Sequence, residues 1–470
     1  MSTEAARLSE AEAAQLLEDL ALGEDYALTS EYVEMVVDAA DRGDGMRLRE
    51  LISALHPADV ADLLGFLSAE LRAEVVPWLP PDLLAETLPE LDDGVREDVL
   101  EMVEPGALAE ALQELDSDDA TGIVEDLEDE QRRAVLAAMP DAERAGIESA
   151  LSYEEDTAGR LMQREVMAAP QFWSVGDAID HMRGHGEELP ELFFDIYVVD
   201  PGYRPVGAVP VSGLLRARRE VKLSEIMEPI NEIAVDQDQE EVAYIFEKYH
   251  LISAPVIDKG GRLVGQITVD DIVNIIQEEN QEDILALAGV TDAGRDANVL
   301  EVVRSRIPWL AVNLGTALIA STVIGVFQAE IQQLVALAVL MPVVASIGGN
   351  AGTQALTVAV RALAMREVSA ANGWRILRRE VAVGLANGMA IAILLAGVTW
   401  LWQRNELLSL VIGLAVVINL VAAALAGTLA PLALDRLGRD PAVSSPVFVS
   451  WVTDTIGFLA FLGLAALILL

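Results

Sequence analysis

Hydrophobic residues follow two different patterns along the chain, and the pattern changes near residue 307. Beyond that point the sequence contains five long apolar stretches, and each exceeds the roughly 20 residues that cross the hydrocarbon core of a bilayer. The five stretches are 307–327, 334–363, 381–402, 407–434 and 447–470. The pattern therefore predicts an all-α membrane domain of five transmembrane helices at residues 307–470.

The first part of the chain carries a helical repeat with a period of 24 residues. Pro57, Pro81 and Pro105 each begin a unit, and apolar residues follow three, seven and ten places later. Proline is favoured in the first turn of a helix, and this spacing places the apolar residues on one helical face. A stack of such helices is an α-solenoid. Residues 1–151 are therefore predicted to form an acidic helical N domain.

Residues 152–279 are predicted to be α/β, because strand-like and helix-like segments alternate twice. Each half contains a strand, a turn, a second strand that begins with Val-Gly, and a helix. The predicted strands are 193–199, 205–209, 255–258 and 263–267, and the predicted helices are 174–183 and 240–249. Residues 280–306 are predicted to continue as a connecting helix that leads into the first membrane span.

Charge is segregated in the same way as hydrophobicity. The net charge is −45, but residues 307–470 contain eight basic and seven acidic residues. Residues 1–306 hold the remaining 23 basic and 69 acidic residues. Such an acidic surface repels phosphate backbones, so nucleic acid is excluded as a partner. The chain has no cysteine, which excludes disulfides and thiolate metal sites.

Arginine placement predicts the orientation in the membrane. Arg304 and Arg306 precede the first span, and the loops after the second and fourth spans are also rich in arginine. The positive-inside rule places these segments in the cytoplasm. The polar, acidic residues 1–12 do not resemble a secretory signal. We therefore expect a multi-pass protein of the cell membrane with a cytoplasmic N-terminus and an external C-terminus.

Asp454 is the one acid well inside an apolar span. A carboxylate in hydrocarbon is costly, so it normally faces a partner or a water-filled cavity. It is a candidate cation site on a permeation path, and the alternative is a structural pairing with Arg361. The spans contain no histidine, cysteine or second buried acid to act as a base or nucleophile. An enzyme is therefore not predicted.

The second span is interrupted by the segment Gly348-Gly349-Asn350-Ala351-Gly352-Thr353-Gln354. Glycine frees backbone carbonyls, and non-helical backbone at membrane depth is tolerated where it lines a cavity. The side-chain oxygens of Asn350, Thr353 and Gln354 suit a hard, hydrated cation. The alternative is close helix packing through small residues. Together with Asp454, the segment favours a pore.

Four short motifs in this order give the chain a resemblance to the MgtE family of magnesium channels. They are Glu155–Met162, Gly348–Gln354, Asp440-Pro441-Ala442 and Thr453-Asp454. The resemblance covers essentially the whole chain. It implies an acidic solenoid, a tandem pair of cystathionine-β-synthase (CBS) domains at residues 152–279, a plug helix at residues 280–306 and a five-helix pore domain.

The resemblance also implies a homodimer in the lipid bilayer. The pore would be formed by the second and fifth spans of both chains. Asp454 from each chain would hold hydrated Mg²⁺, and Asn350 would lie near the inner end of the path. Cytoplasmic Mg²⁺ would bind between acidic faces and close the pore as negative feedback. The family places sensing acids at Asp271, Glu279, Glu282 and Asp283.

ATP is a further ligand that the resemblance implies. Gly265, Thr268 and Asp271 match the Gly-x-x-Thr/Ser-x-x-Asp pattern of nucleotide-binding CBS domains, whereas the first CBS copy has Pro210 and Gly213 in place of Thr and Asp. Two other functions remain open. One is a channel mainly for another divalent cation, such as Mn²⁺ or Co²⁺, since hard oxygen ligands suit several ions. The other is a sensor of Mg²⁺ or nucleotide that the spans only tether to the membrane.

Overall fold

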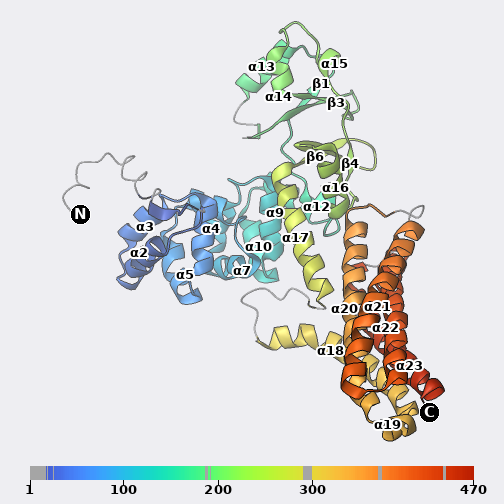
Figure 1. Ribbon diagram of the computed structural model, residues 1–470. Coiled ribbons are helices and arrows are strands. Elements are labelled where there is room, and N and C mark those ends of the chain that lie inside the picture. The colour runs from blue at the N-terminus through green and yellow to red at the C-terminus, as the bar shows by residue number, and fades with distance from the viewer. Residues whose placement is uncertain are drawn as a thin grey trace. The chain divides into compact units, whose positions relative to one another are not determined.

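The computed structural model divides the chain into two compact units (Figure 1). The acidic unit comprises Met1–Glu278 with Gly294–Asp296, and the membrane unit comprises Glu279–Ala293 with Ala297–Leu470. The structure describes residues 17, 20–24, 26–185, 189–190, 192–288, 290, 299–368, 373–437 and 441–469.

The acidic unit begins with a stack of short helices that share one core. They are α2 (Ser30–Asp41), α3 (Gly45–Ile52), α4 (Pro57–Phe66), α5 (Ala69–Val75), the 3₁₀ helix η2 (Val76–Trp78), α6 (Pro81–Thr87), α7 (Asp93–Met102), α8 (Pro105–Ala111), α9 (Ser117–Asp126), α10 (Asp129–Ala138) and α11 (Asp141–Ala150). Pro57, Pro81 and Pro105 each occupy the first position of a helix. The apolar residues of the repeat lie in the common core, which confirms the helical prediction.

The rest of the acidic unit contains two sheets of identical topology. Their orders are β1-β2-β3 and β4-β5-β6, and in each sheet the first pair is parallel and the second antiparallel. The elements are α12 (Ala158–Leu161), β1 (Ala168–Pro170), α13 (Val175–Gly184), β2 (Asp195–Val199), β3 (Pro205–Pro210), α14 (Val211–Arg216), α15 (Leu223–Ile226), β4 (Ile233–Ala234), α16 (Gln239–Tyr249), β5 (Ser253–Ile257) and β6 (Leu263–Thr268). The predicted α/β repeat is present, and the short strands β1 and β4 were not predicted.

Helix α17 (Val269–Leu287) follows β6 directly and belongs to both units. Its first half lies in the acidic unit, and the residues from Glu279 onward lie in the membrane unit. Near its end, Ala286 is buried in a cluster with Leu356, Val360 and Val449. The end of α17 therefore packs against membrane helices. Of the predicted connecting helix, residues 280–287 belong to α17 and residues 299–306 belong to the first membrane helix, while residues 291–298 lie outside the described residues.

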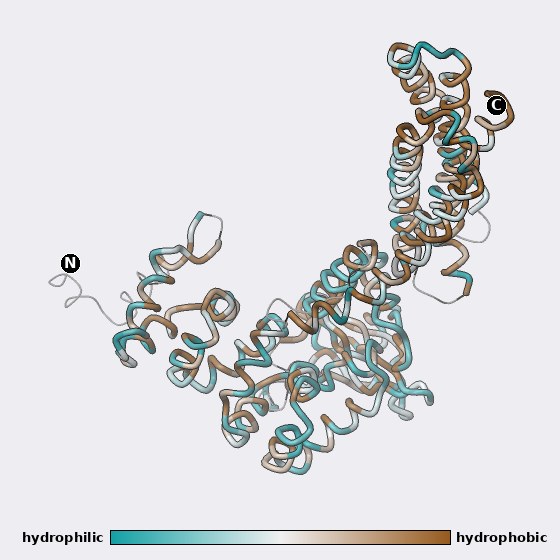
Figure 2. The backbone as a smooth tube through the Cα atoms, turned by 90° about the horizontal axis from the view of Figure 1, so that it is seen from below, coloured by the Kyte–Doolittle hydropathy of each residue, from teal (hydrophilic) through white to brown (hydrophobic). Residues whose placement is uncertain are grey.

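The membrane unit contains the five helices that the hydrophobic pattern predicts. They are α18 (Val299–Val326), α20 (Ala336–Ala364), α21 (Gly373–Gln403), α22 (Glu406–Arg436) and α23 (Pro441–Ile468), with the short α19 (Gln328–Gln333) between the first two. Figure 2 shows that hydrophobic or near-neutral residues cover most of their length. α22 is the central helix, because 61% of its most hydrophobic stretch is buried, against 6% for α18.

The expected interruption of the second span is wrong, because α20 is one continuous helix through Gly348–Gln354. Its glycines serve close packing instead. A Cβ atom at Gly352 would overlap the side chain of Val449 on α23, and one at Gly427 of α22 would lie 2.5 Å from the carbonyl oxygen of Gly352. The segment thus keeps its backbone hydrogen bonds while bringing three helices into close contact.

Candidate cation sites

Helix α20 carries a polar stripe on the side that faces away from the rest of the unit. Ser346, Asn350, Thr353 and Thr357 lie at helical spacing, and all four are exposed. The hydroxyl of Thr353 donates to the carbonyl oxygen of Gly349, and that of Thr357 donates to Thr353. We call these four residues the polar stripe. The two faces of this segment therefore differ. Gly348 and Gly352 lie on the buried face, and Asn350 lies on the exposed face.

Asn350 and Asp454 lie at a similar depth in the membrane unit. A Cβ atom at Gly352 of α20 would lie 3.4 Å from the side-chain methyl of Thr453 on α23. Asn350 is two residues from this contact and Asp454 is one, and a helix rises about 1.5 Å per residue. Since the two helices are antiparallel, both displacements run toward the same end. The fold thus places the two candidate residues of the predicted path at a similar depth on two neighbouring helices.

Asp454 is half-buried and has no hydrogen-bond or ion-pair partner among the described residues. The alternative pairing with Arg361 does not form there, and the Arg361 side chain is exposed. A carboxylate at membrane depth with no protein partner is suited to a cation or to water. Asp440, which forms part of another resemblance motif, lies outside the described residues.

Asn419 is a polar residue of the membrane unit that the sequence analysis missed. It lies in the middle of α22, is fully buried, and its Nδ2 donates to the carbonyl oxygen of Val344 on α20 at 2.9 Å. Its Oδ1 is buried and has no hydrogen-bond partner among the described residues. The signal in the sequence was a single amide in the long apolar stretch 407–434.

A second candidate site lies in the acidic unit, where two helices begin close together. Asp118 and Asp119 lie in the first turn of α9, and Asp270 and Asp271 lie in the first turn of α17. Thr268 donates a hydrogen bond of 2.9 Å to the Asp271 carboxylate. We call Asp118, Asp119 and Asp271 the acid cluster. The positive ends of the two helix dipoles favour negative charge at this point.

Burial and the charges of neighbouring acids raise the pKa of each member of the cluster. Burial, then the charge of Asp271, raises the pKa of Asp119 to about 7, from an ordinary value of 3.8. Burial, with the hydrogen bond from Thr268 opposing it, raises the pKa of Asp271 to about 6. Burial, then Asp271 and Asp119, raises the pKa of Asp118 well above its usual range. Without a cation, the cluster therefore carries unfavourable charge.

The acid cluster does not have the geometry of a preformed metal-binding site. Within the described ranges, no group of three or more histidines and acids is arranged to hold a metal ion. The charges nevertheless act strongly on one another, because the cluster is partly shielded from water. The site could therefore take a hydrated divalent ion, or become tighter when one binds.

The other predicted sensing acids lie farther along α17. Glu279, Glu282 and Asp283 share one helical face, and Glu282 is exposed whereas the other two are partly buried. Eight residues separate Asp271 from Glu279, which corresponds to about 12 Å along the helix axis. The structure thus brings Asp271 to the acid cluster and places the other three nearer the membrane end of α17.

Two of the predicted nucleotide residues already have protein neighbours: Gly265 is buried, and the half-buried Thr268 is hydrogen-bonded. A Cβ atom at Gly265 would lie 2.6 Å from the backbone oxygen of Gln163, and Thr268 bonds to Asp271. A cavity of about 520 Å³ lies elsewhere in the same unit, between the two sheets, and its lining includes Phe194, Asn231 and His250. Neither Gly265 nor Thr268 nor Asp271 lines it.

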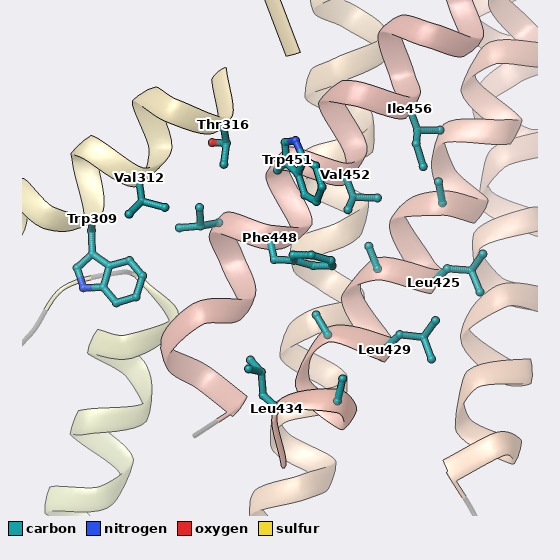
Figure 3. Close-up of a pocket in the computed structure, with 15 residues that line it drawn as sticks. Trp309, Val312, Thr316, Leu425, Leu429, Leu434, Phe448, Trp451, Val452 and Ile456 are labelled. Carbon is teal, nitrogen blue, oxygen red and sulfur yellow. The ribbon is translucent and has the colours of Figure 1, made fainter. Parts of the chain in front are cut away.

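The membrane unit also contains an apolar groove of about 820 Å³ between α18 and the pair α22 and α23 (Figure 3). Leu429, Phe448 and Val452 are among the side chains that line it. No acidic residue lines this groove, and Asp454 is not part of it. The groove therefore lacks the carboxylate ligands that would favour a divalent cation, and Thr316 offers a single hydroxyl.

These features define a multi-pass membrane protein with an acidic unit that contains a helical stack and a pair of α/β repeats. Family models match three regions: "Divalent cation transporter" at residues 341–464, "MgtE intracellular N domain" at 55–156 and "CBS domain" at 223–278. The magnesium transporter MgtE of Thermus thermophilus is 34% identical over 330 residues, which are 69% of this chain and 73% of the relative. The chain belongs to the MgtE family, whose members are transporters and not enzymes.

Other relatives agree with this assignment. The magnesium transporter MgtE of Bacillus subtilis is 32% identical over 333 residues, which cover 70% of this chain and 73% of the relative. Among solved structures, the cytosolic domain of the Mg²⁺ channel MgtE in complex with ATP is 32% identical, with a TM-score of 0.49. The matched region covers 52% of this chain and 99% of that structure. The family models and the two magnesium transporters make the chain a membrane transporter that acts on divalent cations.

Proposed function

We propose that the protein is a Mg²⁺ channel whose path is formed by α20 and α23 of two copies. The observation that carries this proposal is the polar stripe of α20, which is exposed along a membrane-spanning helix. Thr353 and Thr357 bond to carbonyl oxygens of their own helix, but the exposed amide of Asn350 would have no water to bond with if it faced hydrocarbon. The polar stripe is therefore favourable where it borders a water-filled path. A two-fold axis would place the stripes of two copies opposite each other.

Asp454 is the proposed cation ligand on this path. Two copies provide two carboxylates at the depth of Asn350. Mg²⁺ gives up its water reluctantly and is usually held with several waters in place. A pair of carboxylates with amide and hydroxyl groups nearby suits a hydrated ion, and the same chemistry would admit Mn²⁺ or Co²⁺. Flux measurements with each of these ions decide how selective the channel is for Mg²⁺.

The acid cluster is the proposed sensor for feedback by Mg²⁺. Binding of a divalent ion removes the repulsion among Asp118, Asp119 and Asp271, and so favours the arrangement in which they are close. Helix α17 begins at this cluster and ends where Ala286 packs against membrane helices. An ion that binds one arrangement better shifts the population toward it. Glu279, Glu282 and Asp283 would extend the sensor along the same helix.

The proposed orientation follows from charge. The arginines near the start of α18 and the end of α22 belong on the cytoplasmic side by the positive-inside rule. The acidic unit would then be cytoplasmic and the C-terminus external. This arrangement exposes the acid cluster to the Mg²⁺ concentration inside the cell, as a feedback sensor requires.

The test is Mg²⁺ flux into liposomes that contain the purified protein at low Mg²⁺ on the side of the acidic unit. Wild type is compared with Asp454→Asn, which keeps the size of the side chain and removes its charge. We expect Asp454→Asn to abolish Mg²⁺ flux or its preference over Mn²⁺ and Co²⁺. Asp435→Asn, at an exposed position near the end of α22, is the matched control and should conduct like wild type.

The outcome also separates the channel from a tethered sensor. A sensor requires neither Asp454 nor the polar stripe, so neither variant would differ from a wild type that fails to conduct. Equal flux through wild type and Asp454→Asn would contradict the role of this carboxylate. Chemical cross-linking through single cysteines at exposed positions of α20 would test the homodimer, since the natural chain has no cysteine.

ATP binding is proposed for the cavity between the two sheets. Phe194 and His250 offer rings to an adenine, and Asp195 offers a carboxylate to ribose hydroxyls. The lining contains no lysine or arginine, so the phosphates would extend out of the cavity. Calorimetric titration of ATP against wild type, Phe194→Ala and Thr268→Ala distinguishes the cavity from the motif at Gly265, Thr268 and Asp271. Weaker binding by Thr268→Ala alone would favour the motif.

A further inference from the structure

Asn419 lies between the two helices of the proposed path. A Cβ atom at Gly348 of α20 would overlap its Nδ2, and a Cβ atom at Gly457 of α23 would lie 2.7 Å from the same nitrogen. The side chain is fully buried, and Nδ2 donates to the carbonyl oxygen of Val344. One amide of α22 thus contacts α20 and α23 at glycines, where no side chain of those helices intervenes.

This contact is one of two levels along the helices at which α20 and α23 meet at a glycine. Asn350 and Asp454 lie at a depth between these two levels. At one level, Gly352 of α20 faces Val449 and Thr453 of α23 directly. At the other, one helical turn away, Asn419 separates Gly348 from Gly457. Asn350 lies between Gly348 and Gly352 along α20, and Asp454 lies between Thr453 and Gly457 along α23. The two candidate cation residues are therefore bounded on both sides by glycine contacts.

An asparagine that served only for packing at this position would carry an unfavourable free energy. Its Oδ1 is buried without a partner among the described residues, and an unpaired buried acceptor loses its hydration without compensation. Small apolar residues allow helices to approach equally well in membranes. A residue that served only to fill space would not require an amide.

We propose that Asn419 is a positioning residue for the cation path. Its amide sets the separation of α20 and α23 at the Gly348–Gly457 level, and thereby the distance between the groups that Asn350 and Asp454 offer to the ion. Asn419 is fully buried at the contact of the two helices and would not touch the ion itself. This inference rests on the proposed path through α20 and α23.

The test combines Asn419→Ala, Gly348→Ala and the double variant in the full-length protein. Mg²⁺ and Mn²⁺ flux per folded molecule and the thermal midpoint in detergent are measured for each. For Asn419→Ala we expect Mg²⁺ flux to fall about tenfold, a factor that corresponds to about 1.4 kcal/mol, with an altered ratio of Mg²⁺ to Mn²⁺. A purely structural residue would lower the thermal midpoint and leave that ratio unchanged.

The double variant tests the contact itself. The methyl group of Gly348→Ala overlaps the Asn419 amide, so the single variant should lower the thermal midpoint. Truncating Asn419 to alanine makes room for this methyl, so Gly348→Ala with Asn419→Ala should be more stable than Gly348→Ala alone. Gly349→Ala is the matched control, because nothing lies within 4 Å of a Cβ atom there.

Two results would overturn the inference: unchanged flux and ion ratio in Asn419→Ala, or additive effects in the double variant. If Asn419→Ala is not recovered folded, Asn419→Ser keeps a smaller donor and is measured in the same way against the same criteria. Failure of the proposed function appears differently. In that case wild type does not conduct, or Asp454→Asn conducts normally, while the coupling between Gly348 and Asn419 in the thermal midpoint remains.

Discussion

The membrane helices and the helical stack of the acidic unit differ in how often a glycine serves close helix packing. In the membrane unit, Gly348, Gly352 and Gly427 lie where neighbouring helices would collide with a Cβ atom. In the helical stack of the acidic unit, Gly65 and Gly122 face open space. Helices in a bilayer gain little from burying apolar side chains, so they associate through close backbone packing. Helices in water are held by apolar burial, which their glycines do not provide.

Polar residues show the complementary difference. In the membrane unit, few polar groups lie at membrane depth, and Asn419 and Asp454 each occupy a distinct position. The acidic unit carries a large excess of acids, and most of those described are exposed. The acid cluster differs from the rest because burial and mutual repulsion raise the pKa of its members. Single substitutions should therefore matter more in the membrane unit than in the acidic unit.

The largest expected effect is that of Gly352→Ala in the membrane unit. The added methyl would overlap Val449, and overpacking of this kind costs about 1–3 kcal/mol. We expect a lower thermal midpoint in detergent and loss of Mg²⁺ flux in liposomes. Gly397→Ala in α21 adds the same methyl where nothing lies within 4 Å, and it should leave both quantities near wild type. Equal behaviour of the two variants would mean that contact with a neighbouring helix does not decide what a glycine contributes to the membrane unit.

Next in size is the effect of neutralising the acid cluster. Asp118→Asn, Asp119→Asn and Asp271→Asn together remove both the repulsion and the proposed ion ligands. The concentration of Mg²⁺ that half-closes the channel should rise by about tenfold or more, within the range of typical coupling energies. Flux at low Mg²⁺ should not rise above that of wild type, because removing the repulsion also favours the arrangement in which the two helix starts are close. The measurement is flux as a function of Mg²⁺ on the side of the acidic unit.

The matched control for this triple variant removes three exposed acids that begin another helix. Glu128, Asp129 and Glu130 precede or start α10 and are exposed, so Glu128→Gln, Asp129→Asn and Glu130→Gln make the same change in net charge. Their replacement should leave the half-closing concentration near wild type. A similar shift in both triple variants would mean that overall charge, and not the buried cluster, sets the response.

A smaller effect is expected on the pH dependence of stability. The pKa of Asp119 is about 7 in the folded protein, against an ordinary value of 3.8, so between these values the folded state binds more protons than the unfolded state. Stability must then fall as pH rises through this range. Without Mg²⁺, the thermal midpoint of the full-length protein should fall between pH 5 and pH 7.5 more steeply in wild type than in the triple Asn variant of the cluster.

Saturating Mg²⁺ provides a check on the same prediction. An ion that binds the ionised acids replaces the proton as the stabilising partner, so the pH dependence should become flatter in its presence. Equal slopes in wild type and the triple Asn variant, with and without Mg²⁺, would contradict the assignment of the raised pKa values to this cluster.

Local periodicity explains which parts of the fold were predictable from the sequence. The repeat prolines of the helical stack, the Val-Gly strands of the α/β repeat and the five apolar stretches all produced elements at the expected places. The strands β1 and β4 have three and two residues, which is too short for an alternating pattern to be visible. The membrane and acidic units could thus be separated without a structure.

The sites were predictable only where one residue stood out from its neighbours. Asp454 did so as an acid within an apolar stretch. The glycines of Gly348–Gln354 indicated an irregular backbone, but whether glycine interrupts a helix or packs it depends on the neighbouring helix. The acid cluster joins residues about 150 positions apart, and Asn419 gains its significance from glycines on two other helices. Such contacts depend on tertiary packing, which a single sequence does not reveal.

The smallest expected effect concerns a glycine of the acidic unit and completes the contrast. Gly122 lies inside α9, is exposed, and has nothing within 4 Å of a Cβ atom. Glycine inside a helix costs about 1 kcal/mol relative to alanine. Gly122→Ala should therefore stabilise the protein slightly, with unchanged Mg²⁺ flux, whereas Gly352→Ala destabilises it. A fall in the thermal midpoint of Gly122→Ala would mean that this face of α9 is covered in the intact protein.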